Sequence, residues 1–168
     1  MIKIALIAAM DSERGIGRNN DLIWNLPNDM KFFKTRTEGH IVVMGRKNYD
    51  SIPEKYRPLP KRVNCILSRS RSFTAKDCFV FQNMASCLEQ FKEDSRTLFI
   101  IGGGEIYRLA LEELELSEIY LTKIDGVFGA DTFFPEFDES EWQKEVLLRQ
   151  VPDERHSNPF TIYRFYRT

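Results

Sequence analysis

The 168-residue sequence lacks most features that would indicate a metal, membrane or nucleic-acid function. Its three cysteines, Cys65, Cys78 and Cys87, are odd in number and lack metal-type spacing, which predicts free thiols in a reducing cytoplasm. No apolar run approaches the roughly 20 residues that span a bilayer. The net charge of −1 gives no general attraction to nucleic acid or anionic lipid. We therefore expect no metal site, no nucleic-acid partner and no membrane contact.

Histidines and standard phosphate-binding motifs are also scarce. His40 and His156 are far apart in the sequence, and we expect each of them in a surface turn rather than in catalysis. Residues 1–10 are apolar, but Lys3 interrupts them and a charged loop follows, which predicts a strand and not a signal peptide. The glycines at 102–104 match neither GxGxxG nor GxxxxGK[ST], so the Rossmann fingerprint and the P-loop are both excluded.

What the chain does contain is an alternation of strand-like and helix-like segments. Apolar runs without polar alternation predict strands buried on both faces of a largely parallel sheet, at residues 2–10, 41–44, 63–67, 98–101 and 119–124. Residues 79–81 form a shorter candidate, and 142–151 with 160–166 are predicted to close one edge as an antiparallel ribbon. Helices are predicted from Pro27, Arg46, Asn83 and Glu105. These segments predict one three-layer α/β domain, residues 1–168, with a mixed and mostly parallel central sheet.

The segment 22–33 combines one carboxylate with several aromatic rings. Pro27 suits the first helical position, so Asn28 and Asp29 fall in the first turn. Phe32 and Phe33 follow Asp29 by three and four residues, so both rings can lie on its face of the helix. An acid walled by apolar groups can hold a heterocycle and manage a proton. The alternative is a helix-dipole aspartate beside ordinary core aromatics.

Three strand ends carry glycines or cations that suit phosphate groups. Gly45 precedes Arg46 and Lys47, and the segment 68–72 places two arginines among three serines. The glycines at 102–104 stand at a strand–helix junction, where backbone can approach a ligand closely. Solvated basic turns and a plain glycine turn remain alternatives for these segments taken singly. Ligands in such sheets bind beyond the carboxyl ends of the strands.

Taken in order, the motifs resemble one known family. IAAM, GIG, LIWNLPNDMKFFK, VVMGRKNYDSI, RPLPKR, ILSRS, IIGGGEIY, IYLTKID and DTFFP are similar to dihydrofolate reductase of the bacterial type along essentially the whole chain. The resemblance implies a dihydrofolate-reductase-like fold with an eight-stranded mixed sheet and four flanking helices. It also implies NADPH-dependent reduction of 7,8-dihydrofolate to 5,6,7,8-tetrahydrofolate, by hydride transfer to C6 and protonation at N5, which supplies one-carbon metabolism.

The resemblance also assigns residues to roles. It implies a catalytic set of Asp29, Trp24, Leu22 and Thr122, with Asp131 as the partner of the loop near Gly17. The implied substrate-binding residues are Ile7, Asp29, Phe33, Ile52, Leu59, Arg62, Ile101 and Thr122. The implied NADPH-binding residues are Ala9, Ile16, Gly17, Gly45, Arg46, Lys47, Asn48, Ser68, Arg69, Ile101, Gly103, Gly104, Glu105, Ile106 and Tyr107. No metal ligand is implied. Expected partners are dihydrofolate and antifolates such as trimethoprim or methotrexate, and we expect a monomer.

Two positions depart from the usual pattern of the family. Ile23 stands where a proline usually precedes the loop tryptophan, and Asn48 stands where threonine is common. The first change concerns loop mobility and product release, and the second concerns affinity for cofactor and inhibitors.

Three other functions compete with this interpretation. A reductase of the same fold that acts on a ribosylated pyrimidine in riboflavin synthesis would not need the Asp29 helix or Arg62. A nucleotide phosphotransferase would need a phosphate-loop lysine and an acidic metal site. A non-catalytic binding module would have no reason to keep a carboxylate among aromatic rings.

Overall fold

The computed structural model describes residues 1–19 and 24–167. The strands are β1 (Lys3–Met10), β2 (Gly15–Gly17), β3 (Ile41–Gly45), β4 (Val63–Leu67), β5 (Phe79–Phe81), β6 (Thr97–Ile100), β7 (Glu118–Ile124), β8 (Thr132–Phe133), β9 (Gln143–Gln150) and β10 (Phe160–Tyr166). The helices are α1 (Pro27–Thr37), α2 (Arg46–Ser51), α3 (Met84–Gln90) and α4 (Gly104–Glu113), with short 3₁₀ turns η1 (Glu54–Tyr56) and η2 (Glu139–Glu141).

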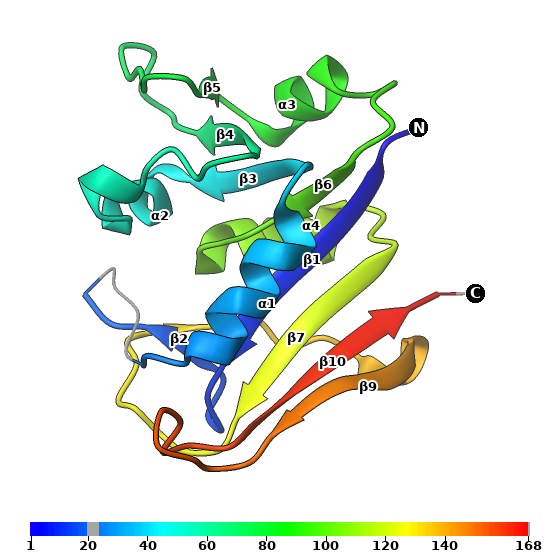
Figure 1. The fold of residues 1–168 in the computed structure, drawn as a ribbon. Coiled ribbons are helices and arrows are strands. Elements are labelled where there is room, and N and C mark those ends of the chain that lie inside the picture. The colour runs from blue at the N-terminus through cyan, green and yellow to red at the C-terminus, as the bar shows by residue number, and fades with distance from the viewer. Residues whose placement is uncertain (20–23, 168) are drawn as a thin grey trace.

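Eight of the strands form one twisted sheet in the order β5-β4-β3-β6-β1-β7-β10-β9 (Figure 1). The first six in this order pair in parallel, whereas β10 runs antiparallel to both β7 and β9. The predicted eight-stranded, mostly parallel sheet with an antiparallel ribbon at one edge is therefore confirmed.

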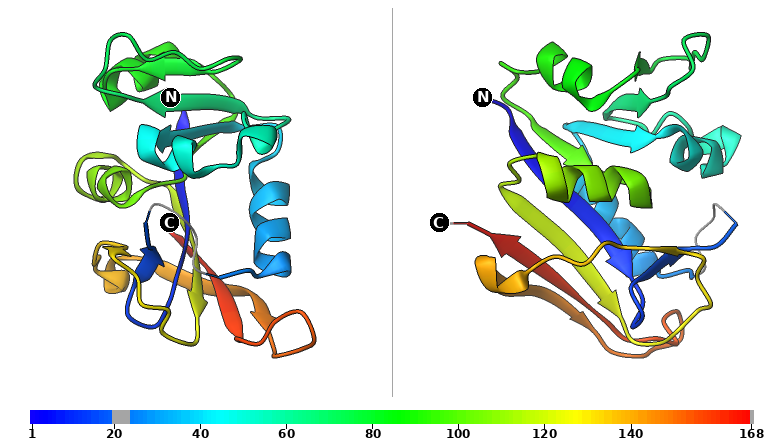
Figure 2. Two further views of the ribbon diagram at one scale, coloured as in Figure 1. Left: turned by 90° about the vertical axis from the view of Figure 1, so that its left-hand side faces the viewer. Right: turned by 180° about the vertical axis from the view of Figure 1, so that it is seen from behind.

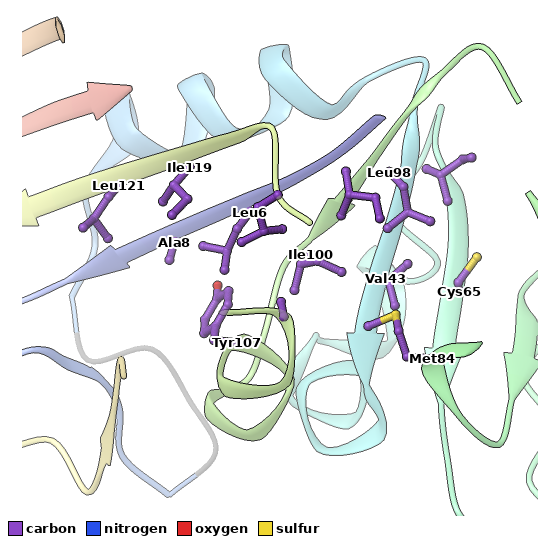
Figure 3. Packing of buried hydrophobic residues seen from close by; sticks show 14 of the residues in the cluster. Leu6, Ala8, Val43, Cys65, Met84, Leu98, Ile100, Tyr107, Ile119 and Leu121 are labelled. Atoms are coloured by element: carbon purple, nitrogen blue, oxygen red, sulfur yellow. The ribbon is translucent and has the colours of Figure 1, made fainter. Parts of the chain in front are cut away.

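Helices cover both faces of this sheet, as parallel strands require. Figure 2 shows α1 and α4 on opposite sides of the sheet. On the α4 side, Leu6, Ala8 and Ile100 pack toward Tyr107 of the helix (Figure 3). On the other face, Ile7 and Phe99 belong to a second buried cluster, and Phe33 of α1 packs against it. The central position of β1 explains its unbroken apolar run, because neither of its faces meets water.

The structure differs from the sequence prediction at a histidine and at a small second sheet. Strands β2 and β8 pair with each other, outside the main sheet, and neither was predicted. The placement of His156 in a surface turn was wrong, because its side chain is completely buried. His40 lies in a bend before β3, is partly buried, and accepts the Thr97 N–H at Nδ1 over 3.0 Å.

Within residues 1–19 and 24–167, no helix is long and apolar enough to cross a membrane. The same part of the chain holds no group of three or more His, Cys, Asp or Glu side chains placed to bind a metal ion. The three cysteines are free thiols.

Candidate active site

The carboxyl ends of β4, β3 and β6 meet along one edge of the sheet. Gly45 pairs with Leu67, so the loops that follow β3 and β4 begin side by side. The Gly45 N–H donates to the Gly102 carbonyl over 2.9 Å, which brings the end of β3 to the glycine turn after β6. The three segments with glycines or cations therefore converge, although they are far apart in the sequence.

Next along this edge lie β1 and β7. Asp29, from helix α1, contacts this part of the sheet. Ala9 pairs with Thr122 in the parallel ladder between the two strands. The Thr122 hydroxyl donates to Asp29 Oδ1 over 2.6 Å, so this carboxylate reaches from the first turn of α1 to the sheet. Burial raises the pKa of Asp29 from 3.8 to about 6, and the bond from Thr122 opposes part of that rise. A carboxyl group with this pKa can hold or release a proton near neutral pH.

Tyr107 closes the floor between β1 and β6. Its hydroxyl lies 2.8 Å from the Ile7 carbonyl and 2.9 Å from the Ile101 carbonyl, and its single hydrogen serves both acceptors. Burial raises the pKa of Tyr107, and the negative charge of Asp29 raises it further. This hydroxyl therefore stays neutral and links the interior of β1 to the residue that follows β6, within electrostatic reach of Asp29.

Apolar residues predicted to bind substrate gather in one cluster. Ile7 and Ile101 are buried members of this cluster, and Phe33, Ile52 and Leu59 pack against it. Arg62 lies over the Phe33 ring, 5.9 Å from its centroid. The Arg62 Nη1 donates to Thr37 Oγ1 over 3.1 Å, and burial lowers the pKa of this guanidinium.

The two rings that follow Asp29 point to different neighbours. Phe32 packs against Tyr120, with ring centroids 6.2 Å apart. Both residues line a cavity of about 430 Å³ that also contacts Lys3 at the start of β1, so it lies toward the amino ends of the strands. Phe33, beside Arg62, is therefore the better candidate for a substrate wall.

The glycine turn at the start of α4 leaves room for a ligand. Gly103 is the N-cap of α4, and no side chain caps the helix there. A Cβ atom added to Gly103 would meet nothing within 4 Å, whereas one on Gly104 would lie 3.2 Å from Thr132 Cγ2. Glu105 is exposed, and a Cβ on Gly45 would approach Ile106 Cγ1 to 3.1 Å. The turn thus combines tight packing on one side with open space at Gly103.

The predicted phosphate-binding side chains lie at the ends of β3 and β4. Arg46 stacks on Phe73 at 4.2 Å, while Lys47 and Arg69 are exposed. Ser68 is buried and its Oγ accepts the Ser70 N–H over 3.2 Å. Asn48, at the site of one departure from the family pattern, donates through Nδ2 to the Ile101 carbonyl over 3.3 Å.

The loop after β1 is attached to the segment around Asp131. The Asp131 N–H donates to the Gly17 carbonyl over 2.9 Å, and Asp131 Oδ2 accepts the Asn19 N–H over 3.0 Å. Ile16 packs against the main core cluster. Trp24 meets Phe128 edge to face at 5.6 Å. Leu22, predicted to act with Trp24, lies outside the described residues.

Asp11 holds together two loops beside the candidate site, a role that the sequence analysis did not predict. This buried carboxylate accepts the Gly15 N–H over 2.7 Å and the Glu13 N–H over 2.9 Å through Oδ1, and the Phe128 N–H over 3.2 Å through Oδ2. Asp11 therefore holds the loop after β1 to the loop after β7. The signal that could have found it is an aspartate at a strand end followed by a glycine-containing loop, which favours local side chain–backbone bonds.

Comparison with known proteins identifies the family. A model of the family "Dihydrofolate reductase" matches residues 3–167. The dihydrofolate reductase of Staphylococcus haemolyticus is 38% identical over 162 residues, covering 96% of this chain and 93% of that protein. The enzyme of Bacillus subtilis is 38% identical, covering 94% and 89%. The structure of dihydrofolate reductase from Enterococcus faecalis in complex with NADP(H) and RAB-propyl matches with a TM-score of 0.89 at 30% identity, over 99% of this chain and 96% of that one. This chain therefore belongs to the dihydrofolate reductase family and is an oxidoreductase that reduces dihydrofolate with NADPH.

Proposed function

We propose that Asp29 is the proton-managing residue of this reduction and that Thr122 braces it. The observation that carries the proposal is the 2.6 Å bond from Thr122 to a partly buried carboxylate whose pKa is raised to about 6. Reduction of the C6=N5 bond requires a proton at N5 as well as a hydride at C6, and an acid with a near-neutral pKa suits that task. Asp29 also offers an acceptor to the amidine-like edge of the pterin.

The apolar cluster supports a binding role for four further residues, and the position of Arg62 beside Phe33 supports one for a fifth. Phe33 and Ile101 provide flat and branched apolar surface for the pterin, while Ile52 and Leu59 suit the benzoyl ring. Arg62 suits the α-carboxylate of the glutamate tail, since a guanidinium binds a carboxylate through two parallel hydrogen bonds. Apolar walls also exclude water, which favours transfer between two closely opposed rings.

The glycine turn fits the pyrophosphate of NADPH. The open space at Gly103 and the uncapped start of α4 allow backbone N–H groups to meet an anion. Bound there, NADPH would supply the hydride. The residues of the chain that would hold it are the remaining members of the predicted set: Ala9, Ile16, Gly17, Gly45, Lys47, Asn48, Gly104, Glu105, Ile106 and Tyr107.

We assign the adenosine 2′-phosphate to Arg46, Ser68 and Arg69. The pairing of Gly45 with Leu67 supports this assignment, because Arg46 and Ser68 follow these partners directly. One arginine guanidinium can bind two phosphate oxygens at once, whereas a site for NAD would place an acidic residue near the ribose hydroxyl.

We further propose that residues 1–168 act as one cytoplasmic, monomeric domain without nucleic-acid or membrane partners. Three free thiols support a reducing compartment. The net charge of −1 supports the absence of nucleic-acid and membrane partners. Antifolates such as trimethoprim or methotrexate are the expected inhibitors, because the chain belongs to the dihydrofolate reductase family.

The test is loss of NADPH absorbance when dihydrofolate is added, with and without an antifolate. Asp29→Asn should lower turnover at neutral pH by about 10²–10⁴-fold, the scale for loss of acid–base assistance. Asp125→Asn is the matched control, because this exposed aspartate lies just beyond β7 and outside the proposed site. Full activity of Asp29→Asn would rule out the assigned role.

A further inference from the structure

The first turn of α1 does not satisfy its own backbone. Leu26, the N-cap residue, has an extended conformation with φ −125° and offers no side-chain acceptor. Pro27 has no N–H, and the N–H groups of Asp29 and Met30 both donate to the Leu26 carbonyl at 3.0 Å. The Asn28 N–H therefore needs an acceptor from elsewhere in the molecule.

His156 supplies that acceptor from the loop between β9 and β10. Its Nε2 accepts the Asn28 N–H over 3.1 Å, across 128 positions of sequence. Its Nδ1 lies 2.9 Å from Asp153 Oδ1, so Nδ1 carries the hydrogen and Nε2 keeps its lone pair. The same Asp153 oxygen accepts the N–H groups of Arg155 and His156, each at 2.8 Å, which fixes the loop around the ring. Figure 1 shows this loop next to the start of α1.

The side chain of Asn28 joins the same contact. Its Nδ2 donates to Gln150 Oε1 over 2.6 Å, and its Oδ1 accepts from Arg155 Nη2 over 3.2 Å. Beneath these bonds, Leu26 and Phe160 pack in one buried cluster. The 151–159 loop thus holds the helix start through two hydrogen bonds, from His156 and Arg155, and the flanking strands add the Gln150 bond and the Phe160 contact.

The contacts made by His156 and by Thr122 hold adjacent parts of α1, the Asn28 N–H and the Asp29 carboxylate. Thr122, which holds the Asp29 carboxylate, pairs with Ile162 of β10. His156, which holds the preceding backbone N–H, lies four residues before the start of β10. One pair of adjacent strands therefore fixes both the carboxylate and the peptide unit next to it.

We infer that His156, oriented by Asp153, is a positioning residue that sets how deeply Asp29 is held in the site. The inference rests on the proposed role of Asp29 and extends it. Without the His156 acceptor the first turn would expose its backbone to water and loosen, so Asp29 would be better solvated. The charged group in contact with His156 is Asp153, and the Arg155 guanidinium contacts the neighbouring Asn28 side chain. The polar groups near Asp29 are the neutral hydroxyls of Thr122 and Tyr107, and the substitutions of His156 leave all of these groups unchanged.

Two substitutions of His156 distinguish the role of its Nε2 acceptor from that of the imidazole ring as a whole. Glutamine places an oxygen near the position of Nε2, whereas asparagine ends near Nδ1 and does not reach Asn28. His156→Asn should move the midpoint of the pH profile of hydride transfer down by about half to one unit, which lowers the rate at neutral pH about three- to tenfold. His156→Gln should keep the wild-type midpoint to within about 0.2 units, because it restores the acceptor. The profiles are measured in single turnovers with NADPH and dihydrofolate.

His40→Gln is the matched control. It removes the Nδ1 acceptor of the Thr97 N–H at the start of β6, so it should lower the melting temperature without moving the pH midpoint. If His156→Asn changes only the melting temperature, or if His156→Gln and His156→Asn shift the midpoint equally, the inference is wrong. Failure of the Asp29 role would appear differently, as full activity of Asp29→Asn.

A measurement on the unaltered protein covers the case in which the variants do not fold. Nitrogen-15 spectra of the imidazole at neutral pH should show His156 with a protonated Nδ1 and an unprotonated, hydrogen-bonded Nε2. The opposite tautomer, or a doubly protonated ring, would overturn the inference.

Discussion

Asp29 remains protonated over a pH range in which an ordinary aspartate is ionised. Its pKa is raised from 3.8 to about 6 by burial, so the fraction able to give a proton falls as pH rises above that value. We expect the rate of hydride transfer in single turnovers to fall about tenfold per pH unit above the midpoint. A rate that stays constant between pH values well below and well above this midpoint would contradict the assignment.

Thr122 provides an independent check on the cause. Its hydroxyl bond lowers the pKa of Asp29 against the larger effect of burial, so Thr122→Val should move the midpoint to higher pH. Thr122→Ser, which keeps the hydroxyl, is the control and should stay near the wild-type midpoint. A shift to lower pH in the valine variant would contradict a pKa-lowering effect of the Thr122 hydroxyl on Asp29.

Arg69 tests the choice of cofactor at the residue scale. Arg69→Ala should weaken NADPH binding by about 1–3 kcal/mol, the scale of a lost charge-assisted hydrogen bond, and should leave NADH binding nearly unchanged. Fluorescence titration with each cofactor measures both values. Arg71→Ala, in the same exposed loop, is the control for a general loss of positive charge. Equal losses for NADPH and NADH would contradict a 2′-phosphate site.

At the scale of elements, the sequence predicted what depends on local patterns. The apolar run at residues 2–10 predicted a strand buried on both faces, and Ile4–Ala8 and Met10 are indeed buried. Asn83 was predicted to cap α3, and its Oδ1 accepts the Ser86 N–H over 2.8 Å. Strands β2 and β8 were missed because segments of three and two residues carry no periodic signal, and the pairing joins residues more than 110 positions apart.

His156 illustrates the same limit for the site. A lone histidine near Pro159 has the sequence context of a turn, and nothing local shows that its ring is buried. Its importance comes from the bond to the Asn28 N–H, which joins residues 128 positions apart. The Asp29–Thr122 pair is equally non-local, and only resemblance to a family joined these two residues in advance.

Gly15 tests the small sheet formed by β2 and β8. A Cβ at Gly15 would lie 2.5 Å from Ala130 Cβ and 2.8 Å from Asp11 Oδ2, and both neighbours are short side chains with little freedom to move. Gly15→Ala should therefore displace β2 from β8, lower the free energy of unfolding by about 1–3 kcal/mol, and weaken NADPH binding. Chemical denaturation and cofactor titration measure the two effects.

A second substitution shows whether the clash is the cause. Adding Ala130→Gly to Gly15→Ala removes the nearer of the two atoms and should recover part of the lost stability. Gly15→Ala with wild-type stability would mean that β2 is held more loosely than the Asp11 bonds indicate.

At the scale of the whole molecule, the sheet holds the Asp29 carboxylate in the proposed active site although its charge is unfavourable for folding. The carboxyl ends of β4, β3, β6, β1 and β7 form one edge. The start of α1, which carries Asp29, is held at this edge by Thr122 of β7 and by His156 from the loop between the antiparallel strands β9 and β10. A carboxylate with a raised pKa opposes folding at neutral pH, so the remaining core must stabilise the domain against it.

This cost can be measured as a pH-dependent gain in stability of Asp29→Asn. Between its ordinary pKa of 3.8 and the folded value of about 6, the folded protein binds more protons than the unfolded chain, so wild-type stability falls as pH rises through this window. Asparagine can still accept from Thr122 but carries no charge. Without ligands, Asp29→Asn should exceed the wild type by about 1–3 kcal/mol near neutral pH, and the difference should vanish below about pH 4. Urea denaturation at several pH values measures it, with Asp125→Asn as the control. A variant less stable than wild type at neutral pH, or a difference independent of pH, would show that the Asp29 charge costs the fold nothing.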